Sequence, residues 1–167
     1  MKLLVISDSH KNIIRMHWAV DYVMPDVIVH LGDHISDAQK LRDSYHNIHF
    51  YMVTGNCDFN EFGKSELMLP LGGVKIFITH GHIYRVKSGL ASLVGKAREL
   101  DADLVLHGHT HRASVHNDGK LWIMCPGQME RHDKIQAASY GVVIIEEGQF
   151  ECGIEMLPTI NEVKTNG

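Results

Sequence analysis

Cysteine, proline and long apolar runs are all scarce in this 167-residue chain. Its three cysteines, Cys57, Cys125 and Cys152, form no pairwise framework and no C-x-x-C motif, which argues against a disulfide-built scaffold and favours reduced thiols. The apolar stretch 1–6 stops at Ser7, so it is too short for the apolar region of a signal peptide or for a membrane span. We therefore expect a cytoplasmic protein that does not contact a membrane.

The chain also lacks an excess of positive charge: 16 lysines and arginines stand against 20 aspartates and glutamates, and the formal net charge is -4. This balance argues against a surface built to bind nucleic-acid polymers or acidic membranes. A chain of 167 residues is long enough for one domain with its own core. We expect that domain to span residues 1–158 and the polar tail, residues 159–167, to be frayed.

Apolar segments in the first third of the chain predict strands that alternate with helices. The first two strands are continuous apolar runs without alternation, as expected for strands that are covered on both faces. Such alternation predicts a largely parallel sheet, with functional residues at the carboxyl ends of its strands. The predicted strands are 2–7, 27–31 and 48–53, and the predicted helices are 13–23 and 37–42.

The pattern changes in the rest of the chain, where strand-like segments predominate and pairs of turn residues separate them. An amphipathic helix is predicted over 88–100, and the strands that follow the next apolar run are expected to be mainly antiparallel. Two sheets packed face to face, with the helices outside, fit this order. The predicted strands are 67–69, 74–79, 103–107, 113–117, 121–125, 139–146 and 150–156.

Side chains of the kinds that bind metals follow five of the first six predicted strands. Residues two apart on an extended chain point the same way, so we expect each closely spaced pair to share a direction. Carboxylates and imidazoles gathered at one edge of a core need partners, and a cation supplies them. The candidate ligands are Asp8 with His10, Asp33, Asn56, His80, and His109 with His111.

Seven ligands are more than one tetrahedral ion takes, but they suit two ions that share a bridging carboxylate. Two-metal sites with ions about 3.5–4 Å apart serve displacement reactions at phosphorus. Mixed nitrogen and oxygen ligands accept most first-row divalent ions, so the metal is set by availability. We expect two divalent ions, with manganese as the first choice and nickel, iron, cobalt or zinc as alternatives.

Together with their neighbours, the candidate ligands form five short motifs: Asp8-x-His10, Gly32-Asp33, Gly55-Asn56-x-Asp58, His80-Gly81 and Gly108-His109-Thr110-His111. As a set, these motifs resemble the five motif blocks of the calcineurin-like metallophosphoesterases, and in particular the small bacterial and archaeal phosphodiesterase branch. The resemblance spans residues 2 to about 131. It implies an α/β fold, a four-layer αββα sandwich of two mixed β-sheets flanked by helices, with the metal site at the carboxyl ends of strands.

The resemblance also implies how the ligands are shared and what they do. Asp33 would bridge two ions beside a bridging hydroxide, which would act as the nucleophile on a small phosphodiester. The remaining ligands would divide into two sets: Asp8, His10 and His111 on the first ion, and Asn56, His80 and His109 on the second.

Further assignments concern catalysis and substrate binding. Asn56 and His82 are the candidate catalytic residues, and His82 is either a proton donor or phosphate ligand, or a supporting histidine at the rim. Cys57 stands where the wider superfamily usually has a histidine that assists the leaving group; a nucleophilic thiolate is disfavoured because no adjacent base is evident. Cys57 and Arg112 are the candidate substrate-binding residues, with Arg131 as a further phosphate candidate and a surface role as the alternative for both arginines.

The leading interpretation is a metal-dependent phosphodiesterase that acts on a small substrate. Two alternatives stay open: a phosphomonoesterase, and a non-enzymatic scaffold of the same fold, such as the retromer subunit. Ligand-type residues in all five motifs favour the enzyme. We expect no nucleic-acid polymer as a partner, and a homo-oligomer stays open.

Overall fold

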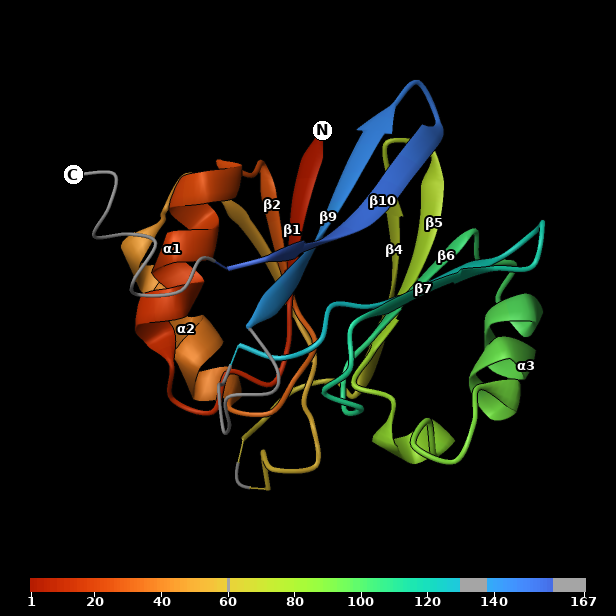
Figure 1. Cartoon of the computed structure of the whole chain (residues 1–167), viewed down its shortest axis with the longest axis horizontal. Coiled ribbons are helices and arrows are strands. Elements are labelled where there is room, and N and C mark those ends of the chain that lie inside the picture. The colour runs from red at the N-terminus through yellow and green to blue at the C-terminus, as the bar shows by residue number, and fades with distance from the viewer. Residues whose placement is uncertain (60, 130–137, 158–167) are drawn as a thin grey trace.

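The computed structural model describes residues 1–59, 61–129 and 138–157. Two β-sheets are stacked face to face between helices (Figure 1). The first sheet has the order β10 (Gln149–Met156), β9 (Ser139–Glu146), β1 (Lys2–Ile6), β2 (Val27–His30), β3 (His49–Met52). The second sheet has the order β4 (Glu66–Leu71), β5 (Val74–Thr79), β6 (Leu104–His107), β8 (Trp122–Cys125), β7 (Ser114–Asn117).

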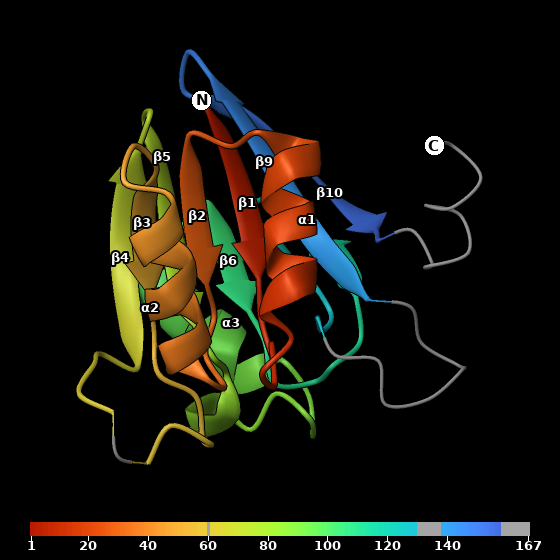
Figure 2. The ribbon, with the colours of Figure 1, turned by 90° about the vertical axis from the view of Figure 1, so that its left-hand side faces the viewer.

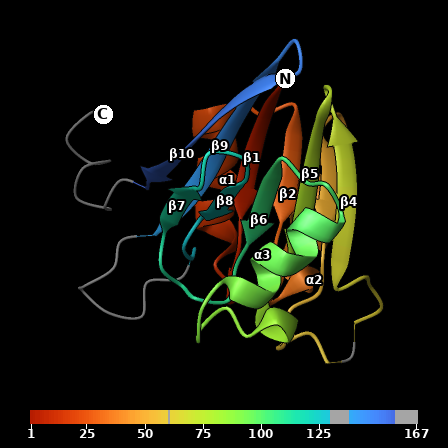
Figure 3. The same cartoon turned by 90° about the vertical axis from the view of Figure 1, so that its right-hand side faces the viewer.

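Helices cover the outer face of each sheet, which confirms the predicted four-layer αββα sandwich. Helices α1 (Ile13–Val23) and α2 (Ile35–Ser44) lie on the first sheet, as Figure 2 shows. Helix α3 (Ala91–Glu99) lies across the second sheet, as Figure 3 shows. Among the described residues, no helix is long and apolar enough to cross a membrane.

Strand β1 shows why the continuous apolar runs form central strands. Its side chains point alternately to the two faces of the sheet. Leu3 and Val5 are buried between the sheets, while Leu4 and Ile6 are buried beneath α1. Each residue of such a strand therefore needs an apolar side chain. Burial of each such side chain contributes roughly 1.5–3 kcal/mol to the stability of the fold.

The parallel strands deliver their carboxyl ends to one edge of the sandwich. Strand β1 runs parallel to β2, β2 to β3, and β5 to β6. The arrowheads of β1, β2 and β6 point toward the same end of the molecule in Figure 2. The loops that follow these strands, and with them the five motifs, are therefore brought together although they come from different sheets.

Several predicted boundaries differ from the structure for identifiable reasons. The helix predicted over 37–42 begins at Ile35 and continues to Ser44. The helix predicted over 88–100 begins only at Ala91, because Gly89 adopts φ 141°, which is not helical. The expectation of mainly antiparallel strands in the last part holds for β7 with β8 and for β9 with β10, but β8 pairs with β6 in parallel.

Three predictions fall outside the described residues. They are the domain boundary at residue 158, the frayed tail 159–167 and the phosphate role of Arg131.

His30, the last residue of β2, is fully buried and uncharged. Its Nδ1 accepts a hydrogen bond of 3.2 Å from the Gly32 amide. Burial lowers the pKa of His30 to about 4, although Asp58 and other carboxylates act in the opposite direction. The folded chain therefore resists protonation of a group that the unfolded chain protonates near pH 6.5.

Acidification should destabilise the metal-free protein partly through His30. Because the folded pKa lies below the unfolded one, the unfolded state binds the extra proton between pH 6.5 and about 4, and stability falls as the pH falls through that range. In His30→Asn the new side chain keeps an acceptor for Gly32 but does not titrate. Over this pH range the variant should therefore lose roughly 3 kcal/mol less of its free energy of unfolding than the wild type loses. Urea unfolding at several pH values measures the difference. The matched control is His116→Asn at an exposed position, which should follow the wild type; a His30→Asn curve with the same slope would contradict the assignment.

Candidate metal centre

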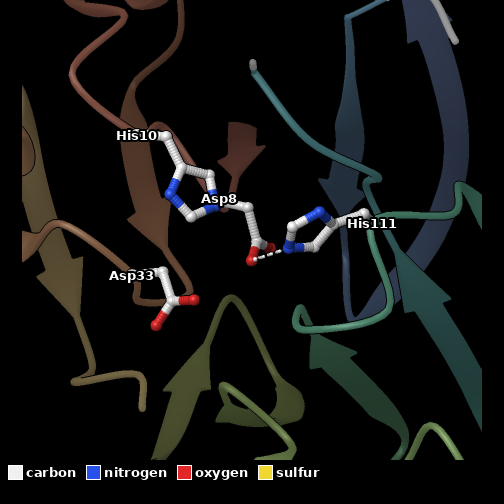
Figure 4. A group of neighbouring side chains, drawn as sticks. All are labelled: Asp8, His10, Asp33 and His111. Atoms are coloured by element: carbon white, nitrogen blue, oxygen red, sulfur yellow. Dashed lines mark ion pairs between the residues drawn. The ribbon is translucent and has the colours of Figure 1, made fainter. Parts of the chain in front are cut away.

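Four of the predicted ligands form one tight group. One ligand atom each from Asp8, His10, Asp33 and His111 lies within 4.8 Å of the others. Figure 4 shows the two carboxylates and the two imidazoles turned toward a common space. These side chains come from the loops after β1, β2 and β6, so the group is assembled from both sheets.

Asp8 is the most enclosed member of this group, with no exposed surface. Its Oδ1 lies 3.0 Å from His111 Nε2, and its Oδ2 accepts hydrogen bonds from the Ser7 hydroxyl at 2.5 Å and from the His109 amide at 3.2 Å. Burial raises the pKa of Asp8, but His111, His80 and Ser7 outweigh it, so the net pKa is lowered. Asp8 is therefore an ionised carboxylate held in a fixed orientation.

A second group surrounds His80. Its Nε2 lies 3.1 Å from Asn56 Oδ1, 3.2 Å from His109 Nδ1 and 3.5 Å from Asp33 Oδ1. Burial lowers the pKa of His109 to about 4, with the charges of His80 and Lys87 adding to the effect. His109 is therefore in the neutral form in which an imidazole binds a metal.

The proton on His80 decides what this second group can hold. Its Nδ1 lies 2.8 Å from the carbonyl oxygen of Leu31, which only accepts, so Nδ1 carries a proton; in the neutral ring, the form that binds a metal, Nε2 then presents a lone pair. Asn56 Oδ1 and Asp33 Oδ1 also present lone pairs toward it, and none of the three atoms can donate to another. Such an arrangement is repulsive unless a cation lies among the atoms.

The spacing of the atoms fits a divalent metal. With metal–ligand bonds of about 2.1 Å, ligand atoms on one ion lie about 3.0 Å apart at right angles and about 3.4 Å apart in a tetrahedron. The separation of 3.0 Å between Asp8 and His111 and those of 3.1 to 3.5 Å around His80 match this range, and the first group as a whole lies within 4.8 Å. Nitrogen and oxygen donors of this mixture suit manganese, iron, cobalt, nickel and zinc.

Asp33 belongs to both groups. One of its carboxylate oxygens lies within 4.8 Å of the ligand atoms of Asp8, His10 and His111, and its Oδ1 also lies 3.5 Å from His80 Nε2. The Cys57 amide donates a hydrogen bond of 2.9 Å to the same oxygen and helps to fix the carboxylate.

The paired ligands converge for a different reason from the one expected. Asp8, His10, His109 and His111 all have positive φ, between 42° and 68°, so these segments are not extended. The expectation that His109 and His111 share a direction is wrong: His109 contacts His80 in one group, and His111 contacts Asp8 in the other. Left-handed backbone of this kind is uncommon outside glycine and clusters at functional sites.

Three glycines allow the loops to interlock. A β-carbon on Gly55 would lie 2.2 Å from Asp33 Oδ1, and one on Gly108 would lie 2.0 Å from Ser7 Oγ. Gly32, at φ 96°, would bring a β-carbon to 2.6 Å from the backbone nitrogen of Gly55. These glycines are the places where one ligand-bearing loop passes directly against the next.

Comparison with known proteins agrees with this geometry. Residues 1–148 match the calcineurin-like phosphoesterase superfamily domain. The chain belongs to this superfamily.

Individual relatives extend the comparison. The probable metallophosphoesterase YsnB of Bacillus subtilis (strain 168) is 35% identical over 154 residues, which cover 87% of this chain and 85% of the relative. A predicted phosphoesterase from Streptococcus pneumoniae TIGR4 is 28% identical in its crystal structure, with a TM-score of 0.75 and coverage of 93% and 88%. Wild-type Vps29 from Entamoeba histolytica, in complex with zinc, shares the fold at 18% identity, with a TM-score of 0.72 and coverage of 93% and 99%.

The other sequence-predicted residues of this phosphoesterase-family chain lie around the centre. His82 is in a 3₁₀ turn, η1 (His82–Tyr84), with its ring 5.4 Å from the ring of His80. The Cys57 side chain is exposed, accepts a hydrogen bond of 3.4 Å from Asn56 Nδ2 and lines a small pocket. Arg112 lines a different pocket, so the two predicted substrate-binding residues are not brought together.

Partial desolvation raises the pKa of the largely exposed Cys57 thiol to about 11, and the neighbouring Asp33 adds to the effect. The thiol is therefore protonated at neutral pH, which agrees with the expectation that it is not a nucleophilic thiolate.

Two buried aspartates position the centre but received no role from the sequence. Asp58 accepts hydrogen bonds from the amides of Gly55, Asp33 and Ile35, at 2.8 to 3.0 Å, and so ties two ligand loops to the start of α2. Asp37 accepts from the Ser9 hydroxyl and the Lys11 amide, which holds the loop that carries His10. Asp58 is the last residue of the Gly55-Asn56-x-Asp58 motif, so the sequence offered a signal for it. Asp37 belongs to none of the five motifs, and its sequence neighbours gave no signal for its role.

Replacement of Gly55 tests the interlocked loops. In Gly55→Ala the new β-carbon meets Asp33, so the carboxylate must move, and the affinity for Mn²⁺ should fall roughly 10–100-fold, as when other groups that orient ligands are removed. The matched control is Gly95→Ala in α3, where an added β-carbon meets no atom within 4 Å. That variant should bind Mn²⁺ normally and gain about 0.5–1 kcal/mol of stability. Calorimetric metal titration decides: wild-type affinity in Gly55→Ala would refute the role of the close approach.

Proposed function

We propose that this chain is a metal-dependent phosphodiesterase that hydrolyses small phosphodiesters at a centre of two divalent ions. The observation that carries the proposal is the position of Asp33, whose carboxylate belongs to both groups of ligand atoms. Two ions that share a ligand in this way serve displacement at phosphorus. The proposed ligands are Asp8, His10 and His111 on one ion, Asn56, His80 and His109 on the other, and Asp33 on both.

When bound, the two cations would lower the pKa of nearby solvent and stabilise the charge that develops on the phosphate oxygens. The chain's own contribution is to hold the ligand atoms in place before they bind. Ser7 and the His109 amide orient Asp8, and the Leu31 carbonyl orients His80. Manganese is the proposed metal, with nickel, iron, cobalt and zinc as substitutes, because the ligands are nitrogen and oxygen.

Two side chains border the centre, Cys57 beside Asn56 and His82 beside His80. His82 has its Nδ1 buried without a hydrogen-bond partner among the described residues, and burial lowers its pKa. Cys57 is a protonated thiol. We propose His82 as the group that holds the substrate or donates the proton, and Cys57 as a passive neighbour whose backbone amide, rather than its sulfur, supports Asp33.

A scaffold function is the second candidate, supported by the likeness in fold to Vps29. The two functions differ in turnover. Release of p-nitrophenolate from a chromogenic diester that requires added Mn²⁺ supports the enzyme, whereas no turnover by protein with both ions bound supports the scaffold. A preference for p-nitrophenyl phosphate, a monoester, would replace the diesterase with a monoesterase.

Metal content tests the shared carboxylate. After reconstitution with manganese, the wild type should hold about two equivalents. Asp33→Ala should lose the most metal of any single ligand substitution, because it removes a ligand of both ions and leaves two cations to repel each other. Elemental analysis after gel filtration gives the count.

Asp43→Ala is the matched control, since Asp43 has an exposed side chain on α2 that pairs with Arg42 at 3.5 Å. It should retain the wild-type metal content. About two equivalents in Asp33→Ala would show that Asp33 does not bridge.

Leaving-group dependence tests the passive role of Cys57. Aryl diesters need little protonation of the leaving group, so Cys57→Ala should change their kcat by less than about threefold, because the backbone amide that supports Asp33 is retained. Cys57→His should selectively raise the rates of alkyl diesters, since general acid catalysis contributes about 10²–10⁴-fold. A series of diesters with leaving groups of increasing pKa measures both effects.

His82→Ala completes the series and should lower alkyl more than aryl rates. A collapse of aryl ester hydrolysis in Cys57→Ala, with metal content unchanged, would assign the thiol a direct catalytic role.

A further inference from the structure

A pocket of about 550 Å³ lies next to the metal centre, on the side of the second sheet. Its lining comes from two stretches of chain, residues 86–90 after η1 and residues 107–116 around the end of β6 and the start of β7. The volume is in the range of pockets that bind small organic ligands. None of the ligands assigned to the metal centre lines it.

The charge of this pocket is of one sign. Lys87 and Arg112 both line it, and among the described residues no carboxylate does. Within residues 1–59, 61–129 and 138–157, neither cation forms an ion pair with a carboxylate. A pocket with two cations and no counter-charge of its own is suited to an anionic group, and a phosphate accepts hydrogen bonds from both side chains.

His107 adds a hydrogen-bond acceptor to the lining. Its side chain is 1% exposed, and its Nδ1 lies 3.0 Å from the carbonyl oxygen of Gly108. Because a carbonyl only accepts, the proton is on Nδ1, and Nε2 carries a lone pair. In the part of the chain that the structure describes, this buried Nε2 has no hydrogen-bond partner. A ligand with an O–H or N–H group would satisfy it, which offsets the cost of a buried, unpaired acceptor.

The position of the pocket relates it to the metal centre. Thr110 lines the pocket and lies in the chain between His109 and His111, which belong to the two ligand groups. Val86 and Leu90 supply apolar surface beside the cations. A molecule whose reacting phosphate occupied the metal centre could therefore extend an arm over Thr110 into the pocket.

We propose that this pocket binds a second phosphate, carried on one ester arm of the diester substrate. The inference rests on the proposed function, because the first phosphate is the one at the metal centre. Lys87 and Arg112 bind the second phosphate, and His107 accepts a hydrogen bond from a hydroxyl or amine on the same arm. The substrate class is thus a small phosphodiester with a further phosphate, and not a simple dialkyl diester.

Binding to metal-free protein tests the pocket without any catalysis. Inorganic phosphate is titrated into chelator-treated protein, and the ring signals of His107 and His116 are followed by NMR. The wild type should bind phosphate with shifts of these two rings. Lys87→Gln and Arg112→Gln should each weaken binding about tenfold, the loss expected for a hydrogen bond between charged groups.

Matched controls lie on the opposite outer layer. Lys40→Gln and Arg42→Gln remove the same charges from α2, far from this pocket in sequence and on the other sheet. They should bind phosphate as the wild type does. Equal weakening in all four variants would mean that the net charge alone is responsible, and absence of binding in the wild type would overturn the pocket as an anion site.

Kinetics on metal-loaded protein distinguish a substrate arm from a free anion. Ethyl p-nitrophenyl phosphate and 2-(phosphonooxy)ethyl p-nitrophenyl phosphate share a leaving group and differ by one phosphate. The wild type should prefer the second substrate in kcat/KM, and each pocket variant should lower that preference about tenfold, mainly through KM. The two α2 variants should keep the preference.

The outcomes separate this inference from the proposed function. Hydrolysis of both substrates with no preference, or with a preference that the pocket variants keep, overturns the second-phosphate site and leaves the diesterase in place. Phosphate binding at the pocket without such a preference also overturns it, in favour of a free anion. No hydrolysis of either substrate contradicts the proposed function, and with it the substrate arm, whatever the phosphate titration gives.

Discussion

The hydrogen bond between His80 and the carbonyl of Leu31 is the contact on which the metal centre depends. It joins the loop after β5 in one sheet to the loop after β2 in the other, at 2.8 Å between Nδ1 and oxygen. It also places a proton on Nδ1, so that in the neutral ring the Nε2 lone pair faces Asn56 and Asp33. One backbone carbonyl therefore both links the layers and orients a candidate metal ligand.

Other contacts across the two sheets have the same character. The amide of His109, from the second sheet, donates to Asp8 from the first, and Gly108 leaves the room that Ser7 needs beside it. Strained left-handed residues persist in such a place because the surrounding contacts determine the backbone on every side. The apolar layer between the sheets thus has a functional consequence: it sets the distance at which two sets of loops meet.

The interlocked loops also make the metal-free centre costly. Lone pairs of Asn56, Asp33 and His80 face one another, and the carboxylates of Asp8 and Asp33 are both buried. Cations that bind such a group contribute their binding free energy to the folded state only, since the ligands are scattered in the unfolded chain. Rigidity gained in this way would hold the ligand-type side chains at a fixed separation.

The sequence by itself determined the layers and most of the ligands. Strands such as 74–79 and 139–146 were predicted with their observed bounds, because apolar residues concentrate in them and turn residues separate them from their neighbours. The five motifs identified the ligand-type residues because carboxylates and imidazoles beside glycine at strand ends have few structural uses.

Only the tertiary structure decided how these residues are shared. Local spacing predicted one direction for His109 and His111, yet left-handed backbone sends them to different groups. The roles of Asp37 and Asp58 depend on amides that are distant in sequence, and the pocket beside Thr110 depends on the approach of residue 87 to residue 112. Periodicity records which face of an element is buried, but contacts between loops of two sheets depend on distances that no local pattern encodes.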